Sequence, residues 1–557
     1  MKNRQEKIYS ILKELALEMG AKDFTFAVEV PKDKSHGDLA SNIALAIFSD
    51  IKNKKLNIKN PLELAEEIVS ILNTGYLIHD TDFDKIEIAS PGFINFYFSQ
   101  RFLSSQVQSI ISQGSNYGSS EIGKGLPAGR QGKKASVEFV SANPTGPLHI
   151  GNARGGPLGD SLANVLSKAG YEVTREYLHN DVGGQVTKLG EAIYYTLNPD
   201  KKPEEEIQYK GDYIKELSEK IQKQLSKDIS KEEFVEKSGE IAVEIMLKEI
   251  LEDCKLMGIR FDKIRKESDL RNEVPKVFEK LKTSLKEKDG ALWFAPNDEF
   301  LKDRETVIRK SDGEYTYFAS DIVYHNEKMS QNDTVIDILG SNHSGHVPRL
   351  QAVVKALGFN VSNLKVVLYQ YVRLKRGEEV LKMSKRAGNF VTAREVLDEV
   401  GKDAFRFFLL TPRSQTHMDF DLELAKKKAS ENPVFYIQYA YSRISSIFAK
   451  SSASAKASAD RQKSDLSLLK TKEEVGLIRH LINFPNLVED VAQNLEVNAF
   501  CNYALETSTL FHKFYETQRV ISEDKKLTKA RLALLKATQI TLKNTLNILG
   551  VNAPEKM

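Results

Sequence analysis

The stretch "ASVEFVSANPTGPLHIGNARGGPLGDSLANVL", residues 135–166, decides the fold. Its first part, 135–140, is short, β-branched and apolar, which predicts a buried strand. A Pro- and Gly-rich loop follows and ends at Gly151, and apolar residues then recur at helical spacing over 158–166. A strand, a glycine loop and a helix start in this order present free backbone N–H groups and a positive dipole end to an anion, most often a phosphate.

Size and composition indicate a multidomain cytoplasmic protein. The 557 residues are too many for one core at about 100–200 residues per domain. A net charge of +3 does not by itself reveal a nucleic-acid partner. Cys254 and Cys501 have no companions at zinc spacing, so we expect neither a disulfide framework nor a metal site. We also expect no signal peptide and no membrane segment, because the start reads as an acidic amphipathic helix and no apolar run is long enough to span a bilayer.

Changes of periodicity along the chain predict an α/β protein of several domains. Residues 1–115 alternate helical patterns with short strands and form a small α/β domain, and the Gly-rich stretch 116–134 is a linker or surface loop. Over 135–425, β-like runs alternate with helical ones, which predicts a Rossmann-like parallel sheet with an inserted helical block at about 201–288. Helices dominate 430–557, which predicts an all-α bundle.

Three stretches carry narrower expectations. The Lys/Glu-rich block 201–288 reads as solvated helix faces, with a dedicated RNA contact as the alternative. The low-complexity stretch 450–464 is expected to be a disordered loop between helices. The last helix carries leucines over 532–549 and should stop at Gly550.

A second signal is the basic stretch "VLKMSKRAGNF", residues 380–390, in which Lys382, Lys385 and Arg386 surround Ser384. A mobile basic loop can fold over a polyphosphate, but alone this stretch reads as a solvated basic turn. The basic stretch becomes a specific signal for nucleotide binding when a His-x-Gly loop lies far upstream of it in an α/β protein. The pair "HIGN" and "KMSK", in this order, resembles the class I aminoacyl-tRNA synthetases.

Neighbouring stretches narrow the resemblance to one family. "VEFVSANPTGPLHIG", "YLHNDVGGQ", "YTYFASDIVYH" and the closing "LGVNAPEKM" each resemble the arginyl-tRNA synthetases. "VPKDKSHGDLASNIAL" (30–45) and "SPGFINFYFS" (90–99) resemble that family's additional N-terminal domain, which touches the outer corner of the tRNA. The resemblance spans nearly the whole chain in the correct order.

The resemblance implies a two-step ligase reaction with ATP, and Mg²⁺ bound to ATP, as cofactors. L-arginine is activated to arginyl-adenylate and then transferred to the terminal adenosine of tRNA(Arg), by a chain expected to be a monomer. His149 is suited to be a positioned donor, and the two lysines of the loop would neutralise the departing pyrophosphate. The residues implied for catalysis are His149, Asn152, Lys382 and Lys385. Those implied for ATP binding are Pro147, His149, Gly151, Asn152, Gly340, Lys382, Met383, Ser384 and Lys385.

The resemblance also implies an acidic pocket for the planar guanidinium of arginine, which carboxylates hold best. The matching residues are Glu138, Tyr317 and Asp321 for the guanidinium, Ser141 and Asn143 for the α-amino and carboxylate ends, and His343. Glu138 lies in an apolar strand, where an unpaired carboxylate is costly, so the alternative is a pair with an internal Arg or Lys. Tyr317 and Asp321 share a face if their segment is helical.

Two positions depart from the family pattern. Asn152 stands where the family usually has a second histidine; it can donate a hydrogen bond but cannot be cationic. "LGSNHSGHVPRL" (339–350) stands where the family more often reads GADHHGY, so Asn342, Ser344 and His346 remove a carboxylate and one imidazole.

By resemblance, the C-terminal helices bind the anticodon, and the implied tRNA contacts are Tyr436, Tyr439, Tyr441 and Met557. Aromatic rings can stack on unpaired bases, but at helical spacing they are also typical of a core. Two alternative functions stay open: a class I synthetase for another amino acid, such as cysteine, and a tRNA-binding paralogue with impaired catalysis.

Overall fold

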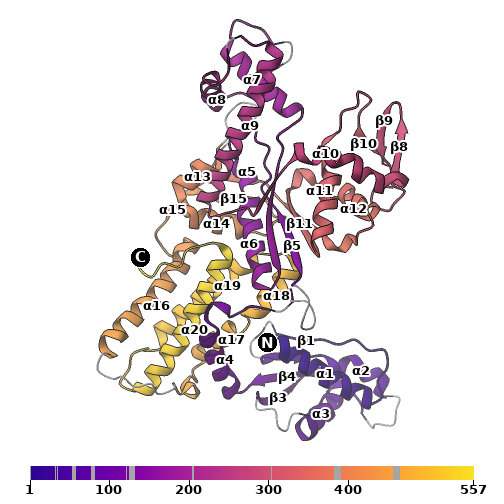
Figure 1. The fold of residues 1–557 in the computed structure, drawn as a ribbon. Coiled ribbons are helices and arrows are strands. Elements are labelled where there is room, and N and C mark those ends of the chain that lie inside the picture. Colours follow the sequence, from indigo (N-terminus) through magenta and orange to yellow (C-terminus); the bar gives the residue numbers. More distant parts are fainter. Residues whose placement is uncertain are drawn as a thin grey trace.

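The computed structural model describes residues 2–31, 33, 36–52, 58–76, 82–120, 122–123, 132–203, 206–226, 228–302, 304–381, 391–455 and 464–557. Figure 1 shows a central sheet, an N-terminal unit and a C-terminal helical bundle beneath it, and two outgrowths at the other end. This is the α/β class predicted from the sequence, with a parallel sheet and a helical C-terminal region. Within the described residues, every helix is too short or too polar to cross a membrane.

The central sheet is five-stranded and parallel, in the order β12-β11-β5-β6-β7. Its strands are β5 (Lys134–Glu138), β6 (Glu172–His179), β7 (Lys263–Lys266), β11 (Thr334–Gly340) and β12 (Leu364–Tyr369). The chain enters in the middle at β5, adds β6 and β7 on one side, and returns to add β11 and β12 on the other. The loops after β5 and β11 therefore diverge, and such a switch point at the carboxyl edge is where open α/β sheets bind ligands.

The strand, loop and helix predicted at 135–166 are confirmed. The side chains of Ala135 and Val137 are fully buried in β5, and the loop leads to α5 (Ile150–Ala153) and α6 (Gly155–Lys168). Helix α6 lies so close to the strand end that a Cβ on Gly159 would sit 2.2 Å from the Phe139 ring. The glycine thus permits the close packing that places the loop at the sheet edge.

Two outgrowths interrupt the sheet (Figure 1). Between β6 and β7 lie α7 (Gly184–Leu197), α8 (Asp212–Gln222) and α9 (Lys231–Leu256). Between β7 and β11 lie α10 (Glu267–Phe278), the 3₁₀ helix η4 (Glu279–Ser284), β8 (Leu285–Lys288), β9 (Ala291–Phe294), β10 (Thr306–Arg309) and α11 (Tyr317–Gln331). The block predicted as helical over 201–288 is wrong in part, because it contains β7 and ends with β8. Strand β7 is short and rich in lysine and arginine, so its composition masked it.

Beyond β11 the chain completes the region around the central sheet. The elements are η5 (Ser341–His346), α12 (Val347–Ala356), η6 (Val361–Asn363), β13 (Val372–Arg376), β14 (Glu379–Val380), α13 (Ala393–Val400), α14 (Lys402–Leu410), β15 (Met418–Asp421) and α15 (Leu422–Lys426).

Fully buried Arg406 of α14 joins three parts of the chain. It donates to the carbonyls of Met257 (3.0 Å) and Leu549 (2.8 Å) and to Asp160 of α6 (2.7 Å). The helix that follows the glycine loop is thereby tied to the end of the C-terminal bundle.

The N-terminal unit is a four-stranded antiparallel sheet, β1-β2-β4-β3, covered by helices. Its elements are α1 (Lys2–Glu18), β1 (Val28–Glu29), β2 (Leu39–Ser41), α2 (Ile43–Lys52), α3 (Pro61–Ile71), η2 (Leu72–Tyr76), β3 (Phe83–Ala89) and β4 (Phe93–Phe98). Asp38 of this unit pairs with Arg479 in the bundle at 2.6 Å. The unit is therefore docked on the bundle at this point.

The bundle comprises α16 (Pro433–Ala455), η7 (Leu466–Leu468), α17 (Lys472–Leu481), α18 (Phe484–Asn494), α19 (Asn498–Thr517) and α20 (Lys525–Leu549). Helix α4 (Gln100–Gln113) and η3 (Gly114–Asn116) lie against it, and Tyr117 donates to the carbonyl of Leu481 at 2.9 Å. The predicted end of the last helix at Gly550 is confirmed, with a φ of 67°. The predicted disordered loop 450–464 is wrong for 450–455, which prolong α16 because Ser, Ala and Lys tolerate a helix; 456–463 lie outside the described residues.

Candidate active site

The histidine turn at the end of the β5 loop is built on a helix start. His149 is the N-cap of α5, and its Nδ1 accepts the backbone N–H of Gly151 at 2.9 Å. This bond leaves the proton of a neutral imidazole on Nε2. A Cβ on Gly151 would lie 3.0 Å from Nδ1, so glycine keeps the ring close to the backbone. The turn thus supplies a fixed imidazole beside the N–H groups of a helix start.

The chain that follows the lysine stretch returns to this turn. Ala393 donates its backbone N–H to the carbonyl of Leu148 at 2.7 Å, and His149 forms an antiparallel bridge with Thr392. Lys382, Met383, Ser384 and Lys385 themselves lie outside the described residues. The structure therefore brings residues 391–393, which follow the lysine stretch in the chain, against the histidine turn.

The other residues implied for ATP lie on the same edge. Pro147 and Asn152 are partly buried in the turn, and the carbonyl of Asn152 accepts from the Tyr369 hydroxyl at the end of β12 (3.3 Å). Gly340 ends β11, and a Cβ there would meet the Asn342 side chain at 2.6 Å. These positions line the switch point between β5 and β11.

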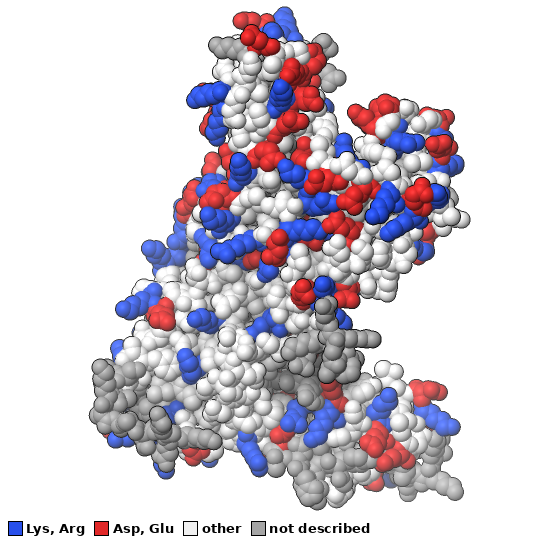
Figure 2. Space-filling view, in the orientation of Figure 1, with Lys and Arg blue, Asp and Glu red and all other residues white. Residues whose placement is uncertain are grey.

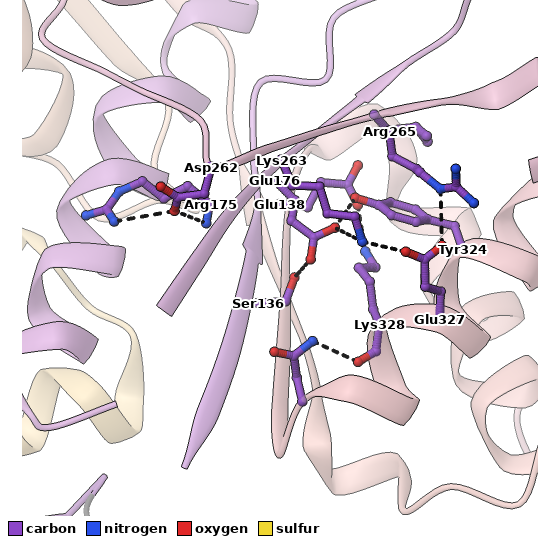
Figure 3. Close-up of polar contacts among 12 residues, drawn as sticks. Ser136, Glu138, Arg175, Glu176, Asp262, Lys263, Arg265, Tyr324, Glu327 and Lys328 are labelled. Atoms are coloured by element: carbon purple, nitrogen blue, oxygen red, sulfur yellow. Dashed lines mark hydrogen bonds and ion pairs between the residues drawn. The ribbon is translucent and has the colours of Figure 1, made fainter. Parts of the chain in front are cut away.

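Glu138 lies at the end of β5 and is 7% exposed. Its Oε2 accepts from Lys328 of α11 at 2.6 Å, and its Oε1 accepts from Ser141 at 3.0 Å. Lys328 is 1% exposed and also donates to Asp337 of β11 at 2.6 Å. Figure 3 shows Lys328 pointing at Glu138 from the neighbouring helix. The pairing with an internal lysine, the alternative to a direct guanidinium contact, is therefore what the structure contains. We call Glu138, Lys328 and Asp337 the closed acidic cluster.

Electrostatics in the closed acidic cluster follow from its burial. Burial raises the pKa of Glu138, against the charge of Lys328. Burial alone would also raise the pKa of Asp337, but the charges of Lys328 and His325 outweigh it and lower that pKa. The pKa of Lys328 is raised by the two carboxylates in spite of burial. The lysine is thus held in its charged form between its partners.

A hydrogen-bonded frame surrounds this cluster (Figure 3). Glu176 of β6 accepts from Ser136 of β5 at 2.7 Å and from Tyr324 of α11 at 2.9 Å. Glu327 of α11 accepts from Arg265 of β7 at 3.1 Å. Helix α11 is therefore fixed along the sheet by contacts with four of its strands, β5, β6, β7 and β11.

The face of α11 nearer the carboxyl edge is more open. Tyr317 is 41% exposed at the helix start, and Asp321 follows one turn later, so the segment is helical and the condition for a shared face is met. Asp321 Oδ2 lies 3.1 Å from His346 Nε2, at the junction of η5 and α12. His343 lies nearby: its pKa is lowered by burial and by the charge of His346.

Glu267, the first residue of α10, is a candidate that the sequence reasoning missed. It is 1% exposed; its Oε1 accepts from Arg271 (3.1 Å) and from Ser320 (3.2 Å), next to Asp321. Its Oε2 is buried with no hydrogen-bond partner among the described residues. Burial raises the pKa of Glu267 to about 7. We call Glu267, Asp321 and Tyr317 the open acidic cluster.

The two polar residues of the β5 loop are held in place by β6 and its exit. Val140 and Ser141 adopt positive φ values of 67° and 35°, and the Ser141 hydroxyl accepts the backbone N–H of Leu178 at 3.1 Å. Asn143 Oδ1 accepts from Asn180 at 2.7 Å. Such sparsely populated backbone angles persist where the surroundings over-determine them, often at functional sites.

The residues implied to contact tRNA differ in how deeply they are buried. Tyr441 is 3% exposed and belongs to the core, so its ring offers no face to a base in this structure. Tyr439 is 42% exposed and stacks at 5.8 Å on His512, which also contacts Tyr436. Met557 is 56% exposed. Figure 2 shows Lys, Arg, Asp and Glu intermixed over the central sheet and its two outgrowths on this face, and a largely uncharged bundle with scattered basic residues.

Comparisons with known proteins agree with this geometry. Family models described as the arginyl tRNA synthetase N terminal domain, the tRNA synthetases class I (R) catalytic domain and the DALR anticodon binding domain match residues 2–98, 107–411 and 437–557. The arginine--tRNA ligase of Carboxydothermus hydrogenoformans is 40% identical, covering 96% of this chain and 95% of the relative. That of Caldanaerobacter subterraneus is 42% identical, covering 95% and 93%.

A solved structure has the same fold. The Thermus thermophilus arginyl-tRNA synthetase is similar with a TM-score of 0.74, at 20% identity, over 99% of this chain and 100% of its own. The catalytic-domain match and this fold define a class I aminoacyl-tRNA synthetase. With relatives at 40% identity along nearly its whole length, the chain belongs to the arginyl-tRNA synthetase family.

Proposed function

We propose that the chain is an arginine–tRNA ligase that uses ATP. The arginine carboxylate attacks the α-phosphate of ATP and pyrophosphate leaves. A ribose hydroxyl of the terminal adenosine of tRNA(Arg) then attacks the carbonyl of the adenylate and AMP leaves. The observation that carries the proposal is the match of all three domain families in order, with relatives of that name at about 40% identity over nearly the full chain. These matches favour arginine over another amino acid.

The histidine turn is the proposed ATP site. His149 would donate from Nε2 to a phosphate oxygen, with Pro147, Gly151, Asn152 and Gly340 around the nucleotide. Lys382 and Lys385, with Met383 and Ser384 between them, would close on the β- and γ-phosphates, and the return of 391–393 to the turn supports this. No group of three His, Cys, Asp or Glu side chains among the described residues could cage a metal. Mg²⁺ would enter bound to the phosphates of ATP, because it usually binds through one or two carboxylates and substrate phosphates.

The open acidic cluster is the proposed guanidinium site. Asp321 and Glu267 would accept the N–H donors, and Tyr317 would cover the plane. Glu138 was implied as a direct guanidinium ligand, but its carboxylate is already bonded to Lys328 and Ser141. We therefore propose that Glu138 shapes the arginine pocket and does not bind the guanidinium directly. Ser141, Asn143 and His343 remain proposed for the α-amino and carboxylate ends of arginine.

The proposed tRNA surface is the bundle, with Tyr436, Tyr439 and Met557 as candidates. Tyr441 would support them from the core. The N-terminal unit is proposed to touch the outer corner of the tRNA, and we expect a monomer, which sedimentation analysis would test.

Pyrophosphate exchange with purified protein, L-arginine, ATP and tRNA tests the function. We expect arginine-dependent exchange, and a drop of about 10²–10³ for Lys385→Ala because one charge-stabilising donor is lost. Exchange no higher than in this variant would favour the impaired paralogue. Exchange with cysteine but not with arginine would end the specificity proposal.

A further inference from the structure

His346 is the last residue of η5 and precedes α12 directly. Its Nε2 lies 3.1 Å from Asp321 Oδ2, and its ring packs edge-on against Phe318, with centroids 5.8 Å apart and planes at 77°. The side chains of His346 and Asp321 are 22% and 24% exposed. The imidazole is thus held by two residues of α11 while one edge stays accessible to water.

The contact matters because Asp321 is a proposed guanidinium ligand, so the inference rests on the proposed function. We propose that His346 positions the Asp321 carboxylate and makes the affinity for arginine depend on the charge of the imidazole. A neutral ring with its proton on Nε2 donates to Oδ2 and leaves the other lone pairs of the carboxylate for the substrate. A protonated ring is a second cation at the same carboxylate and competes with the guanidinium.

Other charged groups face this contact. His343 lies on the same 3₁₀ helix and its pKa is lowered partly by the charge of His346. Glu267 and Arg271 approach from α10, and Asp321 raises the pKa of Glu267. All of them also titrate or carry charge in a His346 variant, so comparing the variant with the wild type isolates the contribution of His346.

The test is the KM for arginine in tRNA-supported exchange between about pH 6 and about pH 8.5, the range in which histidine changes charge. The variants are His346→Gln, which keeps an N–H donor without a titrating charge, and His346→Phe, which removes the donor. His417→Gln, at an exposed position before β15, is the control.

We expect the wild-type KM for arginine to rise toward low pH about fivefold more than that of His346→Gln, the ratio for about 1 kcal/mol. His346→Phe should raise this KM above that of His346→Gln over the whole range while the KM for ATP stays the same, because the carboxylate loses its positioning donor. The control should follow the wild-type profile.

Equal pH profiles for the wild type and His346→Gln would overturn the inference, as would a parallel rise of the arginine and ATP KM values in His346→Phe. A failure of the proposed function can be told apart from a failure of this inference. In that case the wild type shows no arginine-dependent exchange, or Asp321→Asn leaves the KM for arginine unaltered.

Discussion

The closed and open acidic clusters occupy the same edge of the sheet but differ in how their carboxylates are satisfied. In the closed acidic cluster, Lys328 bridges Glu138 and Asp337 with two bonds of 2.6 Å. In the open acidic cluster, Glu267 keeps a buried oxygen without a partner among the described residues, and Asp321 contacts a histidine. Carboxylates already neutralised by a buried cation have few acceptors left and become costly only if that cation is lost, whereas those with unused acceptors can receive a cationic substrate.

Removing the internal cation should give the largest effect on stability. Lys328→Met leaves the buried Glu138 without its cation and Asp337 with His325 as its remaining partner, and breaking a buried pair in this way costs about 3–5 kcal/mol. We expect a lower urea midpoint, followed by the fluorescence of Trp293, the single tryptophan, in β9 of the adjoining outgrowth.

Lys310→Met is the matched control, since Lys310 is exposed and pairs with Glu314 near the surface. Its midpoint should stay at the wild-type value. A Lys328→Met protein as stable as this control would show that the closed acidic cluster does not support the fold.

The next effect should fall on substrate binding. Asp321→Asn keeps the shape but removes a charged acceptor, and hydrogen bonds to charged groups contribute about 1.5–3 kcal/mol, or about 10- to 150-fold. We expect the KM for arginine to rise by this factor in exchange assays, with the KM for ATP nearly constant. Equal losses for both substrates would mean that Asp321 acts on the whole site and not on the guanidinium.

The smallest effect should be a gain in stability. Burial raises the pKa of Glu267 from 4.5 to about 7, so the free protein loses stability as pH rises through this window, because the carboxyl ionises first in the unfolded chain. Glu267→Gln removes that cost. We expect the free variant to be more stable than the wild type at about pH 8, by up to about 3 kcal/mol, and equal to it below about pH 4.5.

Thermal unfolding at the two pH values measures this difference, and exchange assays on the same variant should show weaker arginine use. A variant that is less stable at the higher pH would show that Glu267 is satisfied internally. It would then belong with the closed acidic cluster.

Much of the fold followed from local patterns. The apolar run at 135–140 and the loop ending at Gly151 were sufficient to predict β5, the turn and α6, because strand burial and helix starts depend on nearby residues. Strand β7 was missed, since four residues rich in lysine and arginine carry no apolar alternation. Its edge position in the sheet explains why charged side chains are tolerated there.

Residues of the candidate site could be proposed from the sequence only where they belong to a recognisable motif. Tyr317 and Asp321 were proposed by resemblance, and the structure places both on helix α11. Lys328 gave no signal, because a lysine in "YHNEKMSQ" reads as a solvated helix residue until the fold buries it. Glu267 was equally hidden, since an acidic residue at a helix start is ordinary and its unpartnered oxygen is a tertiary property.

A crystal structure with L-arginine bound tests the central claim most directly. We predict the guanidinium within hydrogen-bond distance of Asp321 and Glu267, with Lys328 still bonded to Glu138. A guanidinium bonded to Glu138, with Lys328 displaced and the open acidic cluster unused, would contradict the account.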